Sequence, residues 1–344
     1  MRGVTLRPIR MSWRVLIAQG AMPDVGAAAL EMLRQAGCQL VMPAARDLFS
    51  TADLMALLPG CDAALASSES YSREVLQSQA AASLKIISRW GVGYDAVDVA
   101  AATEAGICVA YVPGLLNEAV ADYTFALLCA LARRVHEAYL EMTHNTWRKL
   151  WGQDLFGKTL GLIGCGRIGL AVAKRAAGFQ MRLLAFDPVR NAQAQSLGVC
   201  YVALDDLLAS SDFVSLHVAL TAQTRGLIGQ AELKRMKPTA LLINTSRGLV
   251  LDELALAQAL RAGEIAGAAL DVFVTEPLPA DHIFRQTPNL LLSPHQASWA
   301  RDTGAKVSQA AAQAIVDLMA GRQPRWVVDP AVFASAKLRA RLEA

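Results

Sequence analysis

The stretch Gly164-Cys165-Gly166-Arg167-Ile168-Gly169 decides the fold of this chain. It follows the apolar run 159–163 and opens a segment with helical periodicity, so it lies in a turn from a strand into a helix. In such a turn the first glycine permits a tight bend and the second lets backbone N–H groups approach a pyrophosphate. The third glycine lets the helix pack on the strand, and the phosphates lie at the helix N-terminus.

A second apolar run, 183–186, ends at Asp187, about 20 residues after these glycines. The glycine pattern alone is a weak indicator, but a strand on either side and an acidic residue at the end of the second strand make it specific. A carboxylate at this position accepts hydrogen bonds from both ribose hydroxyls, which favours NAD over NADP. The sequence therefore predicts an NAD site.

Composition excludes several classes of protein. The chain has 344 residues, 54% hydrophobic and 18% charged, which is enough for two globular domains. No apolar run reaches the length of about 18 residues that a membrane span needs. A net charge of +3 spread along the chain marks no nucleic-acid face. The six cysteines form no C-x-x-C pair and no cluster with histidine, so we expect no metal site and reduced, buried thiols.

The first residues raise the question of a targeting peptide. Four arginines precede Asp24, the first acidic residue, and transit peptides have this character. No apolar h-region of about 7 to 15 residues follows, because residues 15–18 already read as a strand. We therefore expect a cytoplasmic protein with an irregular start before Met11, with a transit peptide as the alternative.

Apolar or β-branched runs alternate with helical patterns along nearly the whole chain, which predicts parallel sheets flanked by helices. A first set of strands is predicted at 14–18, 39–42, 63–66, 85–88 and 107–111. A second set is predicted at 159–163, 183–186, 213–217, 241–244, 267–272 and 289–292. Four helices are predicted from their caps and periodicity. The first covers 24–37, with Asp24 as its N-cap and Gly37 as its stop. The second covers 117–131 and begins at Asn117. The third covers 252–262, between Asp252 and Gly263, and the fourth covers 300–319.

The mid-chain position of the glycine turn predicts two domains of the α/β class, each a doubly wound parallel sheet. Pro113-Gly114 ends the first set of strands, and the helix from Asn117 leads into the second set. Since the last helix follows the final strand, it is expected to return to the first set. The prediction is a discontinuous, flavodoxin-like substrate domain (1–114 and 300–344) with an inserted Rossmann NAD-binding domain (115–299). A ligand cleft is expected between the domains.

Three charged or titratable side chains follow predicted strands of the second set: Arg247, Glu276 and His295. Parallel sheets bind ligands at this edge. Because NAD carries a hydride, the protein must supply a proton donor and an electrophile for the carbonyl oxygen. His295 suits the first role, helped by a neighbouring carboxylate such as Glu276. Arg247 suits the second and also pairs with a substrate carboxylate. Any one of the three could instead only cap a turn or carry a solvated charge.

Together these features resemble the D-isomer-specific 2-hydroxyacid dehydrogenase family over nearly the whole chain. Besides the glycine turn, the resemblance lies in six segments. They are Arg89-Trp90-Gly91-Val92-Gly93-Tyr94-Asp95-Ala96-Val97-Asp98, Leu216-His217-Val218, Ile243-Asn244-Thr245-Ser246-Arg247-Gly248, Leu270-Asp271-Val272-Phe273, Thr275-Glu276-Pro277 and Ser293-Pro294-His295. The resemblance implies NAD-dependent interconversion of a small 2-oxo acid and its D-2-hydroxy acid, with the same roles for Arg247, Glu276 and His295.

The resemblance also implies the ligand contacts. Gly164, Gly166 and Gly169 shape the cofactor turn, Arg167 and Ile168 meet the pyrophosphate, and Asp187 meets the adenosine ribose. The rest of the cofactor is expected to contact Val92, Val218, Thr245, Ser246 and Asp271. Gly91, Val92 and Gly93 are expected to donate backbone N–H groups to the substrate carboxylate. A plain tight turn remains the alternative for that loop, and a helix or turn cap remains the alternative for Asp271.

Departures from the family pattern bear on the substrate. Leu116 and Ala219 replace the more usual Asn and Pro, and Ala66 lies near where phosphoglycerate dehydrogenases have a phosphate-binding arginine. This disfavours 3-phosphoglycerate. A non-catalytic NADH-sensing scaffold like the family's corepressors is one alternative, and a formate or phosphite dehydrogenase is another. The family resemblance also favours a homodimer, through the helix face 120–131 and the region 147–151, with intramolecular packing as the alternative.

Overall fold

Residues 12–43 and 50–342 are described by the computed structural model, and the chain divides into two units. Unit 1 comprises Met1–Leu116 with Ala300–Ala344, and unit 2 comprises Asn117–Trp299. The predicted boundary falls two residues before this division. The irregular start before Met11 and the arginines at positions 2, 7 and 10 lie outside the described residues.

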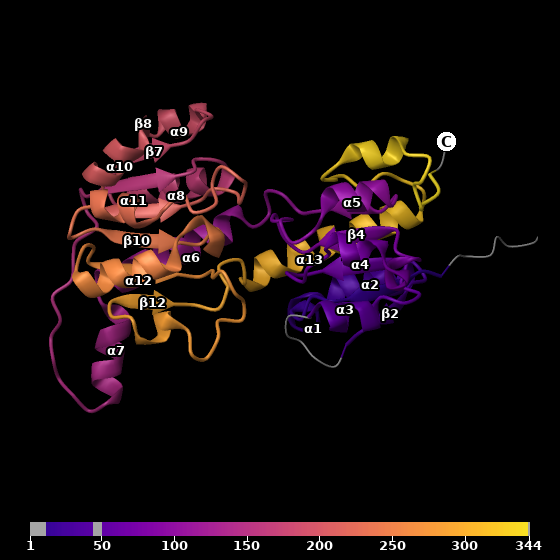
Figure 1. Ribbon diagram of the computed structural model, residues 1–344, viewed down its shortest axis with the longest axis horizontal. Helices are drawn as coiled ribbons and strands as arrows, with labels where there is room; N and C mark the ends of the chain where they lie inside the picture. The colour runs from indigo at the N-terminus through magenta and orange to yellow at the C-terminus, as the bar shows by residue number, and fades with distance from the viewer. Residues whose placement is uncertain (1–11, 44–49, 343–344) are drawn as a thin grey trace, which may run out of the picture. The chain divides into compact units, whose positions relative to one another are not determined.

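Unit 1 is built on a five-stranded parallel sheet in the order β2-β1-β3-β4-β5 (Figure 1). The strands are β1 (Arg14–Ile17), β2 (Gln39–Val41), β3 (Ala63–Ala66), β4 (Ile86–Arg89) and β5 (Cys108–Ala110). This order is that of flavodoxin-like sheets, which confirms the predicted class. The residues of β1, β3, β4 and β5 are almost all buried, as expected for a sheet covered on both faces.

The helices of unit 1 differ from the prediction at one place. They are α1 (Met22–Val25), α2 (Ala27–Gln35), α3 (Thr51–Leu57), α4 (Arg73–Gln77), α5 (Val99–Glu104) and α13 (Arg301–Met319), with short 3-10 turns at Gln79–Ala81 and Pro330–Ala334. The predicted single helix capped by Asp24 is wrong. Helix α1 begins at Met22, two residues before Asp24, with Pro23 in its first turn, so Asp24 lies inside it. Gly26 then separates α1 from α2. The predicted stop at Gly37 is confirmed, since Gly37 has a φ of +93° and its N–H donates to Arg34 O.

Unit 2 is built on a seven-stranded parallel sheet in the order β12-β11-β10-β9-β6-β7-β8. The strands are β6 (Thr159–Ile163), β7 (Arg182–Phe186), β8 (Cys200–Tyr201), β9 (Phe213–Leu216), β10 (Leu241–Asn244), β11 (Gly267–Leu270) and β12 (Leu290–Leu292). The chain reverses its direction of winding between β6 and β9, which is the arrangement of a Rossmann sheet. Such sheets bind ligands outside the carboxyl ends of the strands at this reversal. The two-residue β8 is too short for a sequence pattern to reveal.

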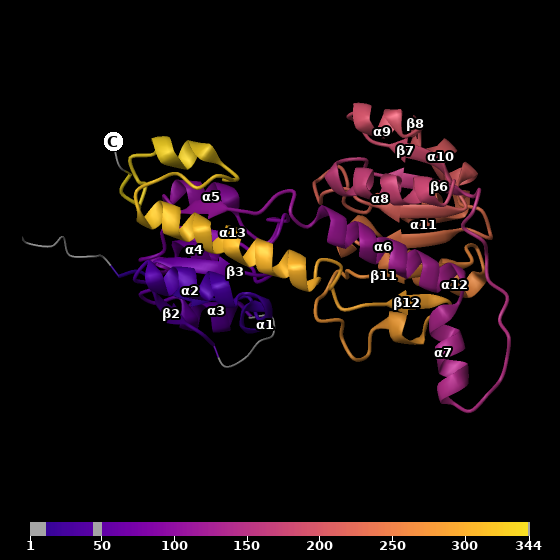
Figure 2. The ribbon, with the colours of Figure 1, turned by 180° about the vertical axis from the view of Figure 1, so that it is seen from behind.

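Helices cover both faces of this sheet. They are α6 (Asn117–Ala132), α7 (Val135–Thr143), α8 (Arg167–Gly178), α9 (Ala192–Ser196), α10 (Leu204–Ser210), α11 (Gln230–Arg235) and α12 (Glu253–Ala262), with 3-10 turns at Gly248–Val250 and Ile283–Gln286. The helices α6 and α8 lie on one face (Figure 2), and α11 and α12 lie on the other (Figure 1). The predicted caps of α12 are confirmed: the Asp252 side chain accepts from Ala255 N, and Gly263 is left-handed.

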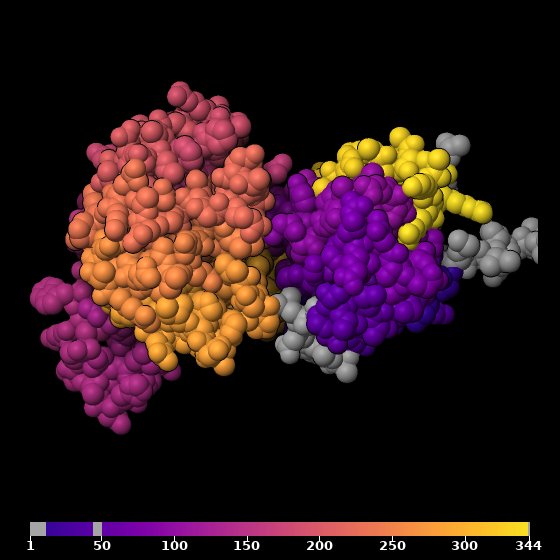
Figure 3. All heavy atoms as spheres, in the orientation of Figure 1, coloured from indigo at the N-terminus to yellow at the C-terminus, as the bar shows by residue number. Residues whose placement is uncertain are grey.

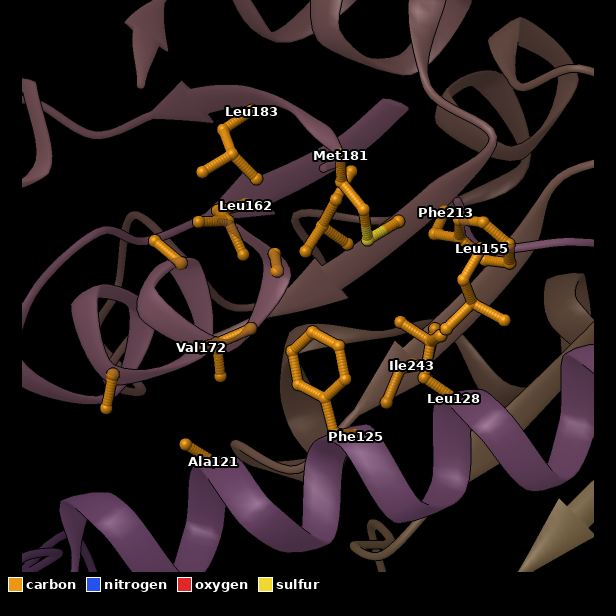
Figure 4. Packing of buried hydrophobic residues seen from close by; sticks show 14 of the residues in the cluster. Ala121, Phe125, Leu128, Leu155, Leu162, Val172, Met181, Leu183, Phe213 and Ile243 are labelled. Carbon is orange, nitrogen blue, oxygen red and sulfur yellow. The ribbon is translucent and has the colours of Figure 1, made fainter. Parts of the chain in front are cut away.

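The apolar face of α6 is occupied within unit 2. Phe125 and Leu128 point from α6 toward Leu162, Val172 and Ile243, as Figure 4 shows. Leu128 is fully buried, and Phe125 is 7% exposed. This face of α6 therefore packs within unit 2, which was the alternative given above. Because these side chains are buried, they cannot form the expected dimer contact.

Thiol burial follows the expectation at four of the six positions. All six cysteines are free. Cys38, Cys61, Cys108 and Cys165 are buried, Cys129 is half-buried, and Cys200 is exposed. The expectation of a buried thiol is wrong for Cys200, because its strand β8 is the edge of the sheet.

Close packing of α8 on the glycine turn makes Gly169 intolerant of a side chain. A Cβ at Gly169 would lie 2.2 Å from the Gly164 carbonyl oxygen, whereas a Cβ at Gly178, in the last turn of the same helix, would meet nothing within 4 Å. We expect Gly169→Ala to lower the free energy of unfolding by about 1–3 kcal/mol. Gly178→Ala should leave it unchanged or raise it by up to about 0.5–1 kcal/mol. Urea unfolding of both variants checks this, and equal effects would contradict it.

Candidate active site

The glycine turn between β6 and α8 forms a cradle for a phosphate group. Gly164 has a φ of +92°, and a Cβ there would lie 2.7 Å from the His217 carbonyl carbon, so this position requires glycine. Gly166 is the N-cap of α8, and no side chain of the described residues caps this helix end. A Cβ on the exposed Gly166 would meet nothing within 4 Å, so the space in front of the helix N-terminus is open. An anion fits here on the uncapped N–H groups of the first turn.

Asp187 follows β7 and is tied to this turn. Its Oδ2 accepts a hydrogen bond from Cys165 N at 2.7 Å, and its Oδ1 accepts one from Val189 N at 2.8 Å. Each carboxylate oxygen keeps a second lone pair, and the residue is only partly buried, so it can still accept from a ribose. The cradle and this carboxylate together fit NAD. When bound in such a site, NAD or NADH accepts or supplies a hydride.

The turn after β10 places Arg247. Asn244, at the end of the strand, is fully buried, and its Oδ1 accepts from Ser246 N at 2.9 Å and from Ser246 Oγ at 2.8 Å. Its Nδ2 donates to Arg247 O at 2.9 Å, so one side chain closes the whole turn. Thr245 is held from the other side, where its hydroxyl lies 2.9 Å from the Thr124 hydroxyl of α6. The Arg247 guanidinium also contacts this turn, through Nη1 and Ser246 O at 2.8 Å.

His295 and Glu276 form a direct pair. His295 Nδ1 lies 2.6 Å from Glu276 Oε2, and Glu276 Oε1 accepts from Phe273 N at 2.9 Å. The glutamate side chain is 19% exposed and the histidine side chain 38%, so the carboxylate is shielded while the imidazole reaches solvent. The predicted proximity of these two residues is thus present in the structure. The second ring nitrogen of His295, Nε2, has no hydrogen-bond partner among the described residues.

The charge of Glu276 is stabilised by its surroundings. Burial by itself raises the pKa of the Glu276 carboxyl, but the hydrogen bond and charge of His295 outweigh this effect. The Phe273 N–H and the charge of Arg247 act in the same direction, so the pKa lies below its ordinary value. Glu276 is therefore ionised at neutral pH, and its contact with Nδ1 fixes the tautomer of a neutral His295.

The backbone of His295 is strained and is held by Asp271. His295 has a φ of +50°, a conformation that costs free energy for a residue other than glycine. Its N–H donates to Asp271 O at 2.8 Å. The Asp271 carboxylate accepts from Gln296 N at 3.0 Å, from Ala297 N at 2.8 Å and from Ser293 Oγ at 2.6 Å. Asp271 is fully buried, and this burial, only partly offset by the hydrogen bonds, raises its pKa. The Asp271 side chain therefore anchors the turn at His295. This agrees with the turn cap that was given above as the alternative for Asp271.

Two other histidines of unit 2 differ from His295 in what their ring nitrogens contact. His282 Nε2 lies 3.2 Å from Glu253 Oε2, and its Nδ1 accepts from Phe284 N at 3.3 Å, so both nitrogens are engaged. His217 Nε2 lies 2.8 Å from Ser215 Oγ, and desolvation of the ring lowers the pKa of His217 to about 3. His217 is therefore neutral at physiological pH. His295 alone of these three pairs one ring nitrogen with a carboxylate and leaves the other available.

The predicted substrate loop lies in unit 1, directly after β4. Gly91 has a φ of +151°, and its N–H donates to Arg89 O at 2.9 Å, so this N–H is already engaged. The N–H groups of Val92 and Gly93 donate to no acceptor in the described part of the chain, and both residues are partly exposed. Adjacent backbone N–H groups that have no acceptor are suited to bind an anion. Of the three predicted donors, two are thus free to bind a carboxylate.

Three contacts of the site were not predicted: the turn-closing Asn244, the Ser293–Asp271 bond, and Gln296 Nε2 bonded to Tyr123 OH of α6. A polar residue at the end of an apolar strand, followed two residues later by serine, was the available signal for Asn244. No sequence signal identifies the other two, because each joins residues far apart in the chain.

The remaining predicted cofactor contacts lie on the loops at this edge of unit 2. Arg167 is exposed at the start of α8, and Ile168 and Val218 are partly exposed. Ser246 is partly exposed, while Thr245 is 8% exposed. In the described residues no group of three or more His, Cys, Asp or Glu side chains could hold a metal ion. Nor does any described helix have the length and apolar character to cross a membrane.

Removing the Glu276 charge has a pH-dependent effect on stability. Because the pKa of folded Glu276 lies below the unfolded value of 4.5, the ionised carboxylate stabilises the fold above pH 4.5. This contribution is lost as the pH falls through the lower, folded pKa. We expect the wild type to exceed Glu276→Gln in free energy of unfolding above pH 4.5 and to lose this advantage below it. Urea unfolding of both proteins between about pH 6 and pH 3 measures this difference in free energy of unfolding. A difference that stays constant over this range would contradict the prediction.

A Rossmann unit with a cofactor cradle, and with an arginine and a histidine–carboxylate pair after its strands, is the arrangement of an NAD-dependent dehydrogenase. Comparison with known proteins gives the family. Residues 125–297 match the NAD binding domain of the D-isomer specific 2-hydroxyacid dehydrogenases. The chain belongs to this family, and NAD is its cofactor.

Similar proteins support this membership. A glyoxylate reductase of Korarchaeum cryptofilum is 46% identical over 261 residues, covering 74% of this chain and 79% of the relative. A D-3-phosphoglycerate dehydrogenase of Archaeoglobus fulgidus is 36% identical over 320 residues, covering 92% of this chain and 59% of the relative. Among solved structures, the apo-structure of D-lactate dehydrogenase from Escherichia coli aligns with a TM-score of 0.80 and 31% identity, covering 92% of this chain and all of that one.

Proposed function

We propose that this dehydrogenase reduces a small 2-oxo acid such as glyoxylate or hydroxypyruvate to the D-2-hydroxy acid with NADH, using His295 as the proton donor. Unit 2 holds the cofactor, and the loop of unit 1 at Val92 and Gly93 binds the substrate carboxylate. The carbonyl carbon receives the hydride, and the carbonyl oxygen receives the proton from His295 Nε2. Oxidation of the 2-hydroxy acid runs the same steps in reverse, with neutral His295 as the base.

The His295–Glu276 pair is the observation that carries this proposal. Its 2.6 Å contact engages Nδ1, so the donor position of the ring is Nε2, which is available. The ionised carboxylate also stabilises the imidazolium that gives up the proton. Arg247 adds a permanent positive charge after the neighbouring strand β10, and its planar guanidinium pairs with a carboxylate and polarises a carbonyl oxygen.

The cofactor contacts complete the proposed site. Gly164, Gly166 and Gly169 shape the turn, and Arg167 and Ile168 meet the pyrophosphate at the N-terminus of α8. Asp187 accepts from the adenosine ribose, which selects NAD. Val92, Val218, Thr245, Ser246 and Asp271 contact the remainder of the cofactor. The position of these residues supports the proposal. The proposed cofactor contacts of unit 2 follow strands β6, β7, β9, β10 and β11, at the edge where such sheets bind dinucleotides.

The proposed substrate is small and carries no phosphate. Ala66 ends β3 and offers no charge where a phosphate would need one. The relative named glyoxylate reductase is more similar to this chain than the relative named D-3-phosphoglycerate dehydrogenase, at 46% against 36% identity. Both observations favour a two- or three-carbon 2-oxo acid.

One experiment tests the reaction, the substrate and the cofactor together. The purified protein is assayed with NADH and, in parallel, NADPH against glyoxylate, hydroxypyruvate, pyruvate and 3-phosphohydroxypyruvate, and with NAD against formate and phosphite. We expect turnover of glyoxylate or hydroxypyruvate with NADH. Turnover of formate or phosphite alone would replace the proposed reaction, and NADH binding without any turnover would favour a cofactor-sensing scaffold.

We also propose a homodimer, formed through an arm of unit 2 that consists of α7 and the following segment 144–156. No residue of α7 is buried. The arm carries exposed aromatic side chains, with Trp151 at 95% exposure, Trp147 at 81% and Tyr139 at 67%. It protrudes from the rest of unit 2, as Figure 3 shows. Aromatic residues in this number mark an interface, and a second copy of the chain is the partner that gives a closed, symmetric assembly.

The double substitution Trp147→Ser and Trp151→Ser tests the arm. We expect the wild type to elute as a dimer and the variant to elute with a larger monomer fraction, because the exposed indole rings supply the apolar contact. Size-exclusion chromatography with light scattering measures the mass. Val189→Ser, which replaces another exposed apolar residue of unit 2, is the control and should leave the mass unchanged. A monomeric wild type would remove the dimer proposal.

A further inference from the structure

Two buried charged side chains, Glu69 and Arg89, lie beside the substrate loop of unit 1 and take no part in the steps above. Glu69 follows β3 and is 3% exposed, and Arg89 ends β4 and is 8% exposed. Burial of a carboxylate and a guanidinium costs free energy even when the charges are paired. The two residues therefore need a structural or functional reason to be where they are.

Arg89 holds the loop at its first turn. Its Nε donates to Gly93 O at 2.9 Å, and its Nη1 approaches Ala66 O at 3.4 Å. Its Nη2 lies 3.8 Å from where a Cβ of Gly91 would be, so the guanidinium lies directly against the turn. Glycine residues leave a loop conformationally free, and a planar side chain with donors in two directions removes that freedom.

Glu69 contacts Ser67, which follows β3, and Tyr71, whose backbone holds the far end of the loop. It accepts from Ser67 N at 3.0 Å and from Tyr71 OH at 3.2 Å. Burial raises the pKa of the Glu69 carboxyl, and the backbone hydrogen bonds and the charge of Arg89 offset part of that rise. Tyr71 in turn fixes the far end of the loop, since its N–H donates to Ala96 O at 2.8 Å and its carbonyl accepts from Asp98 N at 3.0 Å.

We infer that Glu69 and Arg89 are positioning residues for substrate binding: they hold the loop 90–98 so that the N–H groups of Val92 and Gly93 face the substrate carboxylate. The inference rests on the proposed function of that loop. Arg89 acts on the loop through its hydrogen bonds to Gly93 O and Ala66 O, so its proposed effect on the substrate is geometric. Preorganised donors bind an anion without the cost of ordering a flexible loop at the moment of binding.

Arg89→Lys separates geometry from charge. Lysine keeps the positive charge but cannot donate to both Gly93 O and Ala66 O from a rigid plane. We expect the KM for glyoxylate to rise by about tenfold or more in Arg89→Lys and in Glu69→Gln, with kcat within about threefold of wild type. The Kd for NADH should not change, since the cofactor turn belongs to unit 2. Tyr71→Phe removes one contact to Glu69 and should give a smaller rise in KM.

Matched controls come from an exposed pair on α2 of the same unit. Arg34 Nη1 lies 3.8 Å from Glu31 Oε2, and both side chains are more than half exposed. Arg34→Lys and Glu31→Gln should leave KM, kcat and the NADH Kd unchanged.

The outcomes separate this inference from the function on which it rests. A wild type without activity on any 2-oxo acid would overturn the proposed function, and this inference with it. An active wild type whose KM is unchanged in both Arg89→Lys and Glu69→Gln would overturn this inference alone. So would a parallel loss of kcat, NADH affinity and melting temperature, because that pattern shows general support of the fold.

Discussion

Replacing His295 with asparagine is expected to lower kcat for reduction of glyoxylate or hydroxypyruvate by about 10²–10⁴-fold. Asparagine cannot deliver a proton, and neither His217 nor His282, the other two histidines compared above, is placed to replace it. His217 is neutral, with its Nε2 bonded to Ser215, and both ring nitrogens of His282 are engaged. Steady-state kinetics with NADH measure the effect. The Kd for NADH, followed by fluorescence, should remain close to the wild-type value because the cofactor turn is untouched.

His282→Asn is the matched control for this experiment. It also removes a histidine that contacts a glutamate in unit 2, at 3.2 Å rather than 2.6 Å. We expect this variant to keep most of the wild-type kcat and to lose some stability, because His282 packs against Phe284 with ring centroids 4.9 Å apart. Similar kcat values for His295→Asn and the wild type would rule out the acid/base role of His295.

Replacing Arg247 with glutamine is expected to lower kcat/KM by about 10²–10³-fold, the range for loss of one electrostatic group in an active site. In the proposed reaction the Arg247 charge orients the carboxylate and polarises the carbonyl, and the variant loses that charge while glutamine retains hydrogen-bonding capacity. The kcat/KM of Arg247→Lys should lie between those of the wild type and Arg247→Gln, because lysine keeps the positive charge but lacks the planar guanidinium. The Arg247 backbone remains closed by Asn244, so the turn itself is preserved.

Arg235→Gln serves as the control for charge loss in the same unit. Arg235 lies on α11 and pairs with Asp205 at 3.2 Å on the surface. Its removal should leave kcat/KM unchanged, because exposed pairs contribute little free energy. If Arg247→Gln and Arg235→Gln show the same kcat/KM, Arg247 has no part in the reaction.

Patterns that are local in the chain could be read from the sequence. The turn 164–169 and Asp187 are linked by strand, helix and strand periodicity, so their relation is set by neighbouring residues. The approach of Glu276 to His295 was predictable because parallel strands place their carboxyl ends at one edge. The error at Asp24 is also local: the effects of Pro23 and Gly26 on the backbone outweigh the capping preference of an aspartate.

What could not be predicted depends on contacts between distant segments. The side chain of Asp271 is turned toward the His295 turn, and nothing near residue 271 in the sequence indicates that direction. Arg89 likewise reaches Ala66 O, at the end of β3, only because β3 and β4 are neighbours in the sheet. A charged residue next to a glycine-rich loop is normally exposed, so burial of Glu69 and Arg89 contradicts the average behaviour of their residue types.

The hydrogen bond from Cys165 N to Asp187 has a consequence for how this enzyme could evolve a new cofactor preference. A change at Asp187 that admits a 2′-phosphate also removes an acceptor from the backbone of the glycine turn. Selectivity at the ribose and the shape of the pyrophosphate cradle are therefore inherited together. A change of cofactor preference through Asp187 therefore also costs stability in the turn, because Cys165 N loses its present acceptor.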